Sequence, residues 1–412
     1  MAYLGSRPAR TAVTSDQITD GVVTAAKLAT DSVTTVKIAA SNVTTAKIAA
    51  ANVTSAKIAG GSALIGKNLL VNGNFSVAQR GISFAAIADQ AFSLDRWETR
   101  YSSAARVTIT QDTSGAFAAL GGSKTCMKID CTTVDSSIAS GDFFGIRQMV
   151  EAQNCTQLAF GSAAAKAVTI SFNVQSPKSG VHTLVLGNAD SSRSYAAEYT
   201  VASADTAERI SVTIPGDTAG TVFAADTGEG LRLVFSLLSG GDNSKAAGSW
   251  GSSIYEAGSN QQNLLDNTAN NFFLGDVMIE ANTVATDFEH EPISATLAKC
   301  QRYYERWTID DATSTRALSA TSSTTAQADG LWWFKVPKRA DPTFAASAAA
   351  TFVIHYLSGT AAGTAVFGDA LSQEKCRVGI TGISGSPLTV GLGCYITRDG
   401  SDATYLEAIS EL

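Results

Sequence analysis

Charge is scarce in this sequence, and so is histidine. Charged residues make up 16% of the 412 residues, below the roughly 25% of ordinary globular proteins, and Ala, Ser, Thr and Gly fill the gap. The net charge is −7 and no basic stripe with interleaved aromatics is visible, so no nucleic-acid partner is expected. No stretch approaches the roughly 18 consecutive apolar residues of a membrane helix, so membrane insertion is not expected either.

Motifs for catalysis and metal binding are also lacking. The six cysteines are spread from Cys126 to Cys394 without a CxxC pair. Zinc sites need closely spaced ligands, so these residues are expected to be buried free thiols. Neither HExxH nor a GxSxG elbow occurs. The segment 61–68 nearly matches a phosphate-binding loop, but Asn68 stands where the magnesium-binding Ser or Thr is required. The sequence therefore predicts no enzyme, no catalytic residue, no metal ligand and no cofactor.

The clearest feature that is present is a ten-residue repeat. Each copy offers a Val, a small apolar residue and an Ile or Leu, which is too little to bury a core alone. Stacked repeats must therefore share a core with neighbours, along the chain or across chains. We expect residues 23–62 to form a slender shaft of associated chains, and a disordered tail is the alternative. The four copies lie in register at residues 23–29, 33–39, 43–49 and 53–59.

From Lys67 onward, short alternating segments are separated by polar turns such as residues 240–244. Many short strands of this kind are typical of a β-sandwich, which we place at residues 65–292. Three runs carry the alternation most clearly, namely Val168, Ile170, Phe172 and Val174, then Ile210, Val212 and Ile214, then Leu231, Leu233, Phe235 and Leu237.

Three carboxylates, Asp287, Glu289 and Glu291, alternate at the end of this domain. On a strand they would share one side, where they could hold calcium or supply the acid–base pair of a glycosidase. The simpler interpretation is an acidic segment that leads into a helix, because a helix N-terminus favours negative charge.

A helix is predicted over residues 293–307. Its apolar positions follow heptad spacing, which is the pattern of helices that pack along one stripe. Either the helix docks on its own domain or it forms a short junction between several chains. The spacing is carried by Ile293, Leu297, Cys300, Tyr304 and Trp307.

Residues 308–412 again have the alternating pattern of β-strands, and both faces of the predicted strands are apolar or aromatic. Such a sheet is covered on both sides, or one of its faces contacts partner chains or ligand. The runs are Leu331 to Val336 and Phe352 to Leu357.

Several stretches resemble phage tail-fibre proteins. The repeat is similar to shaft repeats near tail-fibre N-termini. Residues 336–343 and the closing Glu411-Leu412 resemble fibre tips. Other segments resemble the start and the end of a carbohydrate-binding-module-like jelly roll found in many such fibres. These are residues 68–75 (NLLVNGNF), 78–81 (AQRG), 95–97 (DRW), 274–280 (LGDVMIE), 285–290 (ATDFEH) and 300–304 (CQRYY).

The resemblance implies a mainly β homotrimer with an extended repeat shaft, a jelly-roll β-sandwich, a short helical junction and a C-terminal β-rich tip. Residues 1–22 would attach the fibre to other tail proteins, and the distal domains would meet a glycan or receptor on the host surface. The N-terminus lacks the apolar core of a secretory signal, so the chain is expected to be made in the host cytoplasm and to work in the virion tail.

Sugar recognition uses aromatic rings that stack on the apolar faces of pyranose rings. The candidate ligand-binding residues are Trp332, Trp333 and Tyr356 in the last domain, and Trp250 and Tyr255 in a Gly/Ser-rich loop. Core or trimer packing is the alternative for each. Trp97 is expected in the core, because it belongs to the DRW pattern. Two other functions stay open, namely a polysaccharide depolymerase of the tailspike kind and a purely structural fibre.

Overall fold

The computed structural model divides the chain into two units, residues 1–61 and 62–412. The structure describes Ile18, Thr24 and residues 67–189, 192–309, 318–369, 371–398 and 404–412. The predicted shaft and attachment peptide therefore lie outside the described residues, apart from two isolated positions. None of the described helices has the length and hydrophobicity to cross a membrane.

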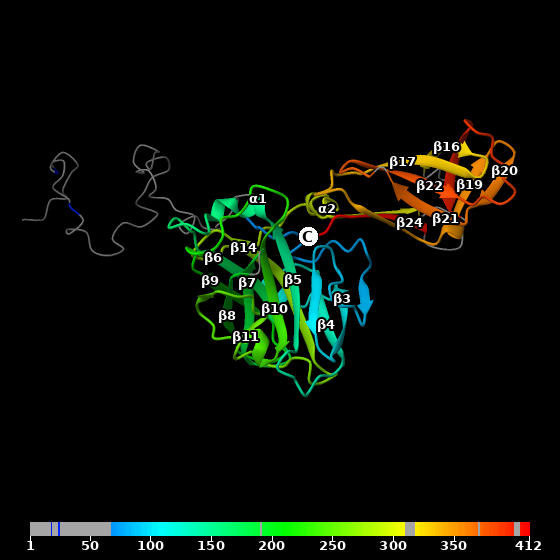
Figure 1. Ribbon diagram of the computed structural model, residues 1–412. Coiled ribbons are helices and arrows are strands. Elements are labelled where there is room, and N and C mark those ends of the chain that lie inside the picture. Colours follow the sequence, from blue (N-terminus) through cyan, green and yellow to red (C-terminus); the bar gives the residue numbers. More distant parts are fainter. Residues whose placement is uncertain are drawn as a thin grey trace, which may run out of the picture. The chain divides into compact units, whose positions relative to one another are not determined.

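A β-sandwich fills the first part of the described chain (Figure 1). Its two six-stranded sheets have the strand orders β1-β3-β4-β14-β6-β9 and β12-β8-β7-β10-β5-β2. Consecutive strands repeatedly cross from one sheet to the other, as in jelly rolls. The first sheet comprises Ser83–Ala85 (β1), Arg106–Asp112 (β3), Cys126–Thr133 (β4), Asn271–Glu280 (β14), Val168–Gln175 (β6) and Glu208–Ile214 (β9). The second comprises Trp250–Gly251 (β12), Ser194–Val201 (β8), Gly180–Asn188 (β7), Glu229–Ser239 (β10), Phe143–Glu151 (β5) and Glu98–Ser102 (β2).

Short elements complete this domain. Strands β11 (Ser244–Lys245) and β13 (Ala257–Gly258) pair in parallel. Helix α1 (Ala152–Cys155) follows β5 directly. The described 3-10 turns of this domain are Ala118–Leu120, Thr156–Leu158 and Gly241–Asn243, and one further described turn, Ala349–Thr351, lies in the last part of the chain.

The sandwich core forms around Trp97, which is fully buried. Its ring centre lies 4.9 Å from that of Phe75 and 6.4 Å from that of Phe235, and its Nε1 donates to the Asn72 carbonyl at 3.1 Å. Alternate residues of β6 and β10 point into the same core. The predicted β-sandwich and the core position of Trp97 are therefore confirmed.

Gly73 explains one motif of the sequence. A Cβ at this position would lie 2.0 Å from the Val277 carbonyl oxygen. The Gly73 carbonyl in turn accepts a hydrogen bond from the Val277 amide at 2.9 Å. The backbone approach leaves no room for a side chain, so the NGNF segment needs glycine there.

The predicted helix over 293–307 is too long. Helix α2 spans Ile293–Gln301, and strand β15 begins three residues later at Tyr304 and ends at Ile309. Ile293, the first position of the predicted stripe, is exposed, whereas Cys300 is buried. The heptad spacing predicted too long a helix because Tyr304 and Trp307 come after the turn that ends the helix. The YERWTI segment has high β-propensity and forms a strand instead.

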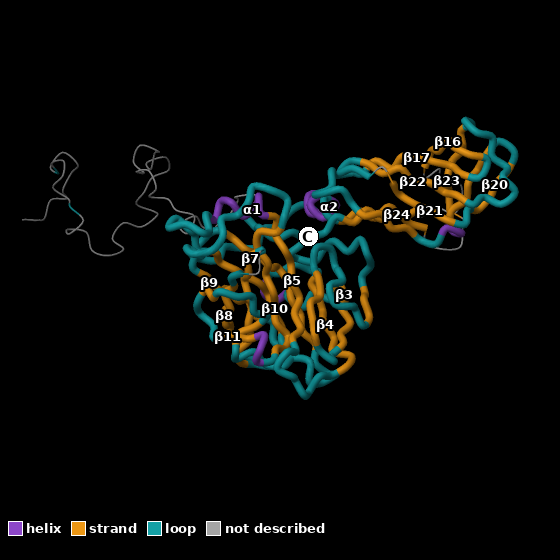
Figure 2. The backbone as a smooth tube through the Cα atoms, in the orientation of Figure 1, coloured by secondary structure: helices purple, strands orange, loops and turns teal. Residues whose placement is uncertain are grey.

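Two further sheets form the C-terminal β domain (Figure 2). The three-stranded sheet has the order β15-β24-β18, with β24 at Thr404–Ile409 and β18 at Thr343–Ala346. The seven-stranded sheet has the order β20-β19-β23-β16-β17-β22-β21. Its strands are Gly359–Ala362 (β20), Phe352–Tyr356 (β19), Gly393–Arg398 (β23), Leu318–Thr324 (β16), Gln327–Trp333 (β17), Lys375–Thr381 (β22) and Ala365–Asp369 (β21).

The core of this domain lies on one side of the seven-stranded sheet. Ile354, Val378 and Ile396 are buried there, and Leu406 of the three-stranded sheet joins the same cluster. Most of the alternating residues on the other side are half-buried or exposed, as the pattern of β17 shows. We call this other side the open face. The sequence predicted either a sheet covered on both sides or a sheet with one face for partner chains or ligand. Within this chain, the seven-stranded sheet has one covered face and one open face.

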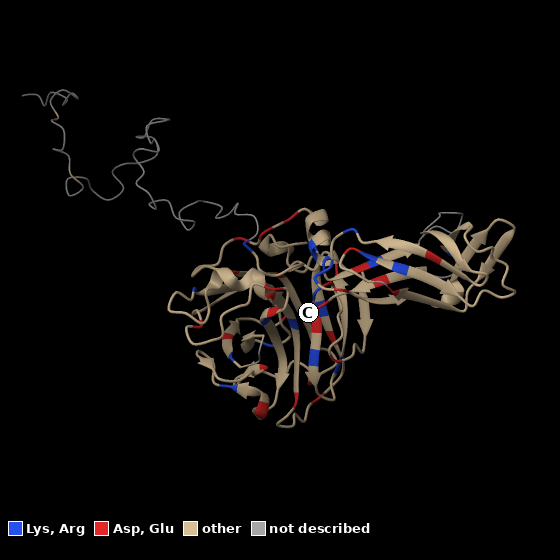
Figure 3. Cartoon of the chain, turned by 45° about the horizontal axis from the view of Figure 1, so that its top comes forward, with Lys and Arg blue, Asp and Glu red and all other residues tan. Residues whose placement is uncertain are grey.

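A buried ion cluster ties the carboxyl terminus to the sandwich. The Glu411 side chain is 5% exposed and accepts hydrogen bonds from Arg96 and from Arg80, the latter at 3.1 Å. The Arg96 side chain is 1% exposed, donates to the Met149 carbonyl at 2.7 Å and lies 3.5 Å from the centre of the Tyr303 ring. Figure 3 shows charged residues gathered around the carboxyl terminus.

A second pair extends this cluster. Arg302, at the end of α2, donates to both Glu151 carboxylate oxygens at 2.7 and 2.9 Å. Arg339 donates to the carbonyls of Ser410 and Glu411 at 3.0 and 2.8 Å. The AQRG, DRW and CQRYY motifs and the closing glutamate, which are far apart in the sequence, thus meet in one place. We call Arg80, Arg96, Glu151, Tyr303 and Glu411 the junction cluster.

Candidate functional site

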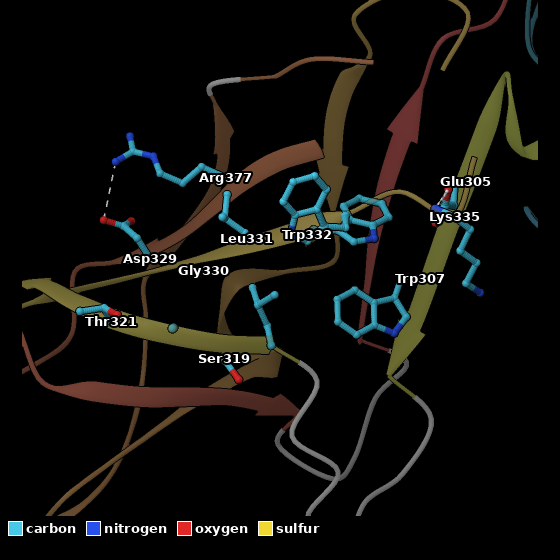
Figure 4. A pocket seen from close by; sticks show the side chains of 13 residues that line it. Glu305, Trp307, Ser319, Thr321, Asp329, Gly330, Leu331, Trp332, Lys335 and Arg377 are labelled. Atoms are coloured by element: carbon cyan, nitrogen blue, oxygen red, sulfur yellow. Dashed lines mark hydrogen bonds and ion pairs between the residues drawn. The ribbon is translucent and has the colours of Figure 1, made fainter. Parts of the chain in front are cut away.

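A groove of about 730 Å³ lies on the C-terminal β domain. Its lining comes from β15, β16, β17 and β22, and Figure 4 shows the side chains from close by. Three tryptophans line it, namely Trp307, Trp332 and Trp333. An open groove with several indole rings suits a ligand that has flat apolar faces.

Adjacent tryptophans on β17 have opposite environments. Trp332 is 3% exposed and packs 6.2 Å from Trp307 and 5.0 Å from Phe334, measured between ring centres. Trp333 is 58% exposed on the open face. Since successive side chains of a strand point to opposite faces, Trp332 packs into the core on the covered side of the sheet, and Trp333 supplies a free ring surface on the open face.

Charged groups beside the groove are paired. Arg377 donates to both oxygens of Asp369, from Nε to Oδ1 at 2.5 Å, and its Nη1 lies 3.7 Å from Asp329 Oδ2. Hydrogen bonding from Arg377 lowers the pKa of Asp369, and the same contact raises the pKa of Arg377. The Lys375 ammonium lies 4.8 Å from the centre of the Trp333 ring. The groove therefore offers hydrogen-bonding groups without a strong net charge.

Glu305 also lines the groove, but its carboxylate already has hydrogen-bond partners. It accepts the Lys335 amide at 3.0 Å and the Lys338 ammonium at 2.7 Å. Lys338 is fully buried and also donates to the carbonyls of Gln301 and Val336. Burial lowers the pKa of Lys338, and Glu305 opposes this shift. This acid serves to hold a buried cation.

The other predicted aromatic residues lie elsewhere. Tyr356 lines a smaller neighbouring hollow with His355 and Tyr395. Trp250 belongs to the sandwich, where its Nε1 donates to the Pro215 carbonyl at 2.8 Å and its ring packs edge-on against Phe160. The structure therefore does not bring the five candidates together.

Tyr255, the last of these candidates, is half-buried in the sandwich loop. Its amide lies 3.3 Å from the Ser194 hydroxyl, and the Lys245 ammonium lies 5.6 Å from its ring centre. Only Trp332 and Trp333 share the groove.

The three alternating carboxylates do not converge on a shared site. No strand forms over residues 281–292. Glu289 accepts the Asn68 amide at 3.0 Å, and Glu291 pairs with Lys299 of α2. Across the described residues no group of three potential metal-ligating side chains gathers. The strand geometry that the calcium and glycosidase interpretations required is therefore absent here.

All six cysteines are buried and unpaired, as expected. Burial raises the pKa of Cys155 to about 12 and that of Cys376 to about 11. A thiol with a raised pKa is a poor nucleophile and a poor metal ligand near neutral pH. Cys131 and Cys155 belong to the sandwich core, and Cys376 and Cys394 belong to the core of the C-terminal β domain.

Sequence reasoning missed Trp307, Asp329 and Arg377 as groove residues. Trp307 was assigned to the predicted helix, although the alternation in residues 304–309 could have indicated a strand. Nothing local in the sequence marks Asp329 or Arg377, because their proximity comes from pairing of β17 with β22.

No protein-family model matches the sequence, and neither does any curated protein. Among solved structures, the carbohydrate-binding module CBM4 aligns at 14% identity over 51% of this chain and 98% of its own, with a TM-score of 0.28. TmCBM61 in complex with β-1,4-galactotriose aligns at 12% identity over 52% and 99%, with a TM-score of 0.25. The enzymatically active domain of bacteriophage CBA120 tailspike protein 4 aligns at 9% identity over 52% of this chain and 22% of that one, with a TM-score of 0.26.

Proposed function

We propose that this chain is a glycan-binding fibre protein of a phage tail, and that it acts without catalysis. The observation that carries the glycan-binding proposal is the exposed Trp333 ring in a groove of about 730 Å³, with Asp329 and Arg377 also in its lining. Pyranose rings present apolar C–H faces together with hydroxyl groups. Such a ligand is matched by indole rings flanked by carboxylate and guanidinium groups.

The fibre part of the proposal rests on the sequence. Four copies of a decapeptide that cannot bury a core alone favour association of chains. Three chains joined in this way would present three grooves. Linked sites of low individual affinity gain avidity by orders of magnitude when they engage one surface, so a shallow groove suffices for adhesion.

The assembly is tested by mass measurement of the full chain in solution. We expect three copies. A monomer at micromolar concentration would contradict the trimer and leave the groove proposal standing, because the groove is built from one chain.

Glycan binding is tested on an array of bacterial surface polysaccharides, with the full chain and the variant Trp333→Ala. Loss of an exposed ring that stacks on sugar is expected to weaken binding at least about tenfold, as for truncation of a hot-spot aromatic. Val390→Ala is the matched control, because Val390 is 59% exposed and does not line the groove. Equal binding by wild type and Trp333→Ala would contradict the groove assignment.

A polysaccharide depolymerase is the second candidate. Glycosidases use two carboxylates, one of which is an available acid. At the groove, Glu305 is bound to Lys338, and Asp329 accepts from Gln327 Nε2 at 2.9 Å and lies near Arg377. Both acids are therefore engaged, which favours binding over hydrolysis. Release of oligosaccharides from a bound polymer, abolished in Asp329→Asn, would establish the depolymerase instead.

A purely structural fibre is the remaining alternative. It predicts that the full chain binds no polysaccharide and does not adhere to bacterial cells. We expect adhesion to sensitive cells and its reduction by Trp333→Ala. Wild-type levels of adhesion in that variant would show that the receptor contact lies elsewhere on the chain.

A further inference from the structure

One row of outward side chains crosses the whole seven-stranded sheet on its open face. His355 pairs with Thr360 on one side and with Tyr395 on the other, and Tyr395 pairs with Ser319. Cross-strand partners point to the same side of a sheet. This half of the row therefore runs from β20 through β19 and β23 to β16.

The row continues to the opposite edge. Ala320 pairs with Gly330, which sets Ser319 opposite Leu331. Leu331 pairs with Arg377, and Arg377 pairs with Asp369. Because neighbouring strands lie about 4.8 Å apart, seven strands give a track about 29 Å long.

Two hollows lie along this track and share Ser319. The larger is the tryptophan groove, and the smaller, of about 340 Å³, is lined by His355, Tyr356 and Tyr395. Ser319 is exposed and small, so its own side chain leaves the passage between the hollows open at this point of the row. The centres of β17 and β19 are three strand spacings apart, or about 14 Å.

The smaller hollow is built around a ring pair. The His355 and Tyr395 rings stack with centres 4.6 Å apart and planes 6° apart. His355 Nε2 lies 2.9 Å from Thr397 Oγ1, which holds the imidazole in place. Both residues line this hollow. Rigid rings beside hydroxyl groups are the same chemistry that the tryptophan groove offers.

We propose that the two hollows form one continuous site for a linear, uncharged polysaccharide that runs across the strands. This inference rests on the proposed glycan-binding function and specifies the ligand as the interior of a chain of several sugar units. A single terminal sugar would use only one hollow. A linear polymer would contact Trp333 at one end, pass Ser319 and reach the His355–Tyr395 pair.

The charge on the open face supports a neutral ligand. Asp329 and Asp369 balance Lys375 and Arg377, and Arg377 is held by both acids. An anionic polymer would have to compete with these carboxylates. A second copy of the chain is a poorer occupant, because interface cores are depleted in charged residues and this face carries paired charges along the row.

The test measures binding of the full chain to a length ladder, from monosaccharide to decasaccharide. The ladder is prepared by acid hydrolysis of the polysaccharide that binds best in the array. Wild-type affinity is expected to rise with length until a fragment spans both hollows. His355→Ala is expected to weaken binding of the longest fragments about tenfold and to leave short fragments within about twofold, since one ring contact is lost at the far hollow.

Ser319→Leu provides an independent variant. A branched side chain at this exposed strand position is compatible with the fold but obstructs the passage between the hollows. It is expected to abolish the gain of affinity with length. Thr381→Ala is the control, because Thr381 lies on the same open face and lines neither hollow.

The outcomes separate the two proposals. Binding that depends on Trp333 but not on fragment length, His355 or Ser319 would overturn the continuous site and leave the groove function intact. Absence of binding to every polysaccharide would overturn both. A change in oligomeric state in His355→Ala or Ser319→Leu, with unchanged length dependence, would instead make this face an interface between copies and overturn the inference.

Discussion

The junction cluster and the open face place aromatic and charged residues in opposite settings. In the cluster, Arg96 and Glu411 are almost fully buried, and the Tyr303 ring packs on the Arg96 guanidinium. On the open face, Trp333 is exposed, and the Arg377–Asp369 pair is about 40% exposed on each side chain (41% and 43%). The same residue types therefore serve fold stability in one region and remain available to a ligand in the other.

This difference separates recognisable motifs from the candidate site. The AQRG, DRW and CQRYY motifs supply Arg80, Arg96 and Tyr303 to the junction cluster. None of these residues lines the groove. The motifs that resemble tail-fibre proteins thus contribute contacts that stabilise the fold. The groove residues, in contrast, follow no recognisable sequence motif.

Arg96→Ala should produce the largest loss of stability. Truncation leaves the Glu411 carboxylate buried and removes a donor from the Met149 carbonyl. Breaking one side of a buried pair typically costs about 3–5 kcal/mol, measured as the free energy of unfolding in urea. Arg100→Ala is the control, because its pair with Asp89 is 29% exposed on each side and should cost less than about 1 kcal/mol.

Equal effects of these two arginine variants would break the distinction between the regions. The interaction free energy between Arg96 and Glu411 is measured by a double-mutant cycle that combines Arg96→Ala with Glu411→Gln. We expect the double variant to be less destabilised than the sum of the single variants, because the second substitution removes a buried carboxylate whose remaining arginine partner among the described residues is Arg80.

The adjacent residues Trp332 and Trp333 allow the same comparison between a buried and an exposed side chain within strand β17. Trp332→Ala is expected to lower the free energy of unfolding by about 3 kcal/mol or more, as for large aromatic residues deleted from a core. Trp333→Ala should change it by less than about 0.5 kcal/mol, while weakening glycan binding as described above. Similar unfolding curves for both variants would show that Trp332 is not part of the core.

Glu151→Gln gives a pH-dependent test of the junction cluster. Burial raises the pKa of Glu151, but hydrogen bonds from Arg302 and Tyr303 outweigh it and lower the pKa below its ordinary value of 4.5. A carboxylate with a lowered pKa stabilises the fold above its unfolded pKa, and this contribution is lost as pH falls through the folded pKa. The wild type should therefore be more stable than the variant by about 1–3 kcal/mol near neutral pH.

The same difference should shrink at pH values below about 4.5, measured by urea unfolding across the acid range. Asp369→Asn is the matched comparison on the open face. Its pKa is also lowered by an arginine, but the pair is exposed, so the substitution is expected to change stability little at any pH. A constant difference for Glu151→Gln across the acid range would contradict the assigned cause.

Much of the fold was predictable because local alternation controls it. The strands around Val168 and Leu231 follow from residues two apart that share a buried face, and Trp97 was placed correctly in the core. The helix over 293–307 was predicted too long, because Trp307 fits both a heptad and a strand. Short apolar runs are ambiguous in this way until tertiary contacts choose between them.

The candidate site was predictable only in part. Trp332 and Trp333 were identified as aromatic residues of the last domain, but the sequence did not distinguish the buried ring from the exposed one. Trp250 satisfies its donor at the Pro215 carbonyl and packs inside the sandwich domain, which no local pattern indicated. The function proposed for the groove, and the trimer proposed from the repeat, stay predictions.

By itself, the sequence determined that this chain is built mainly of β-strands, that its thiols lie buried and free, and that short alternating strands form a β-sandwich. These features depend on composition and on period-two spacing, which act over a few neighbouring residues. Only the tertiary structure decided that Glu411 meets Arg96, and that Ser319, Arg377 and His355 lie on one track. Such contacts depend on strand order and register, because hydrogen bonding across strands joins residues that sequence distance keeps apart.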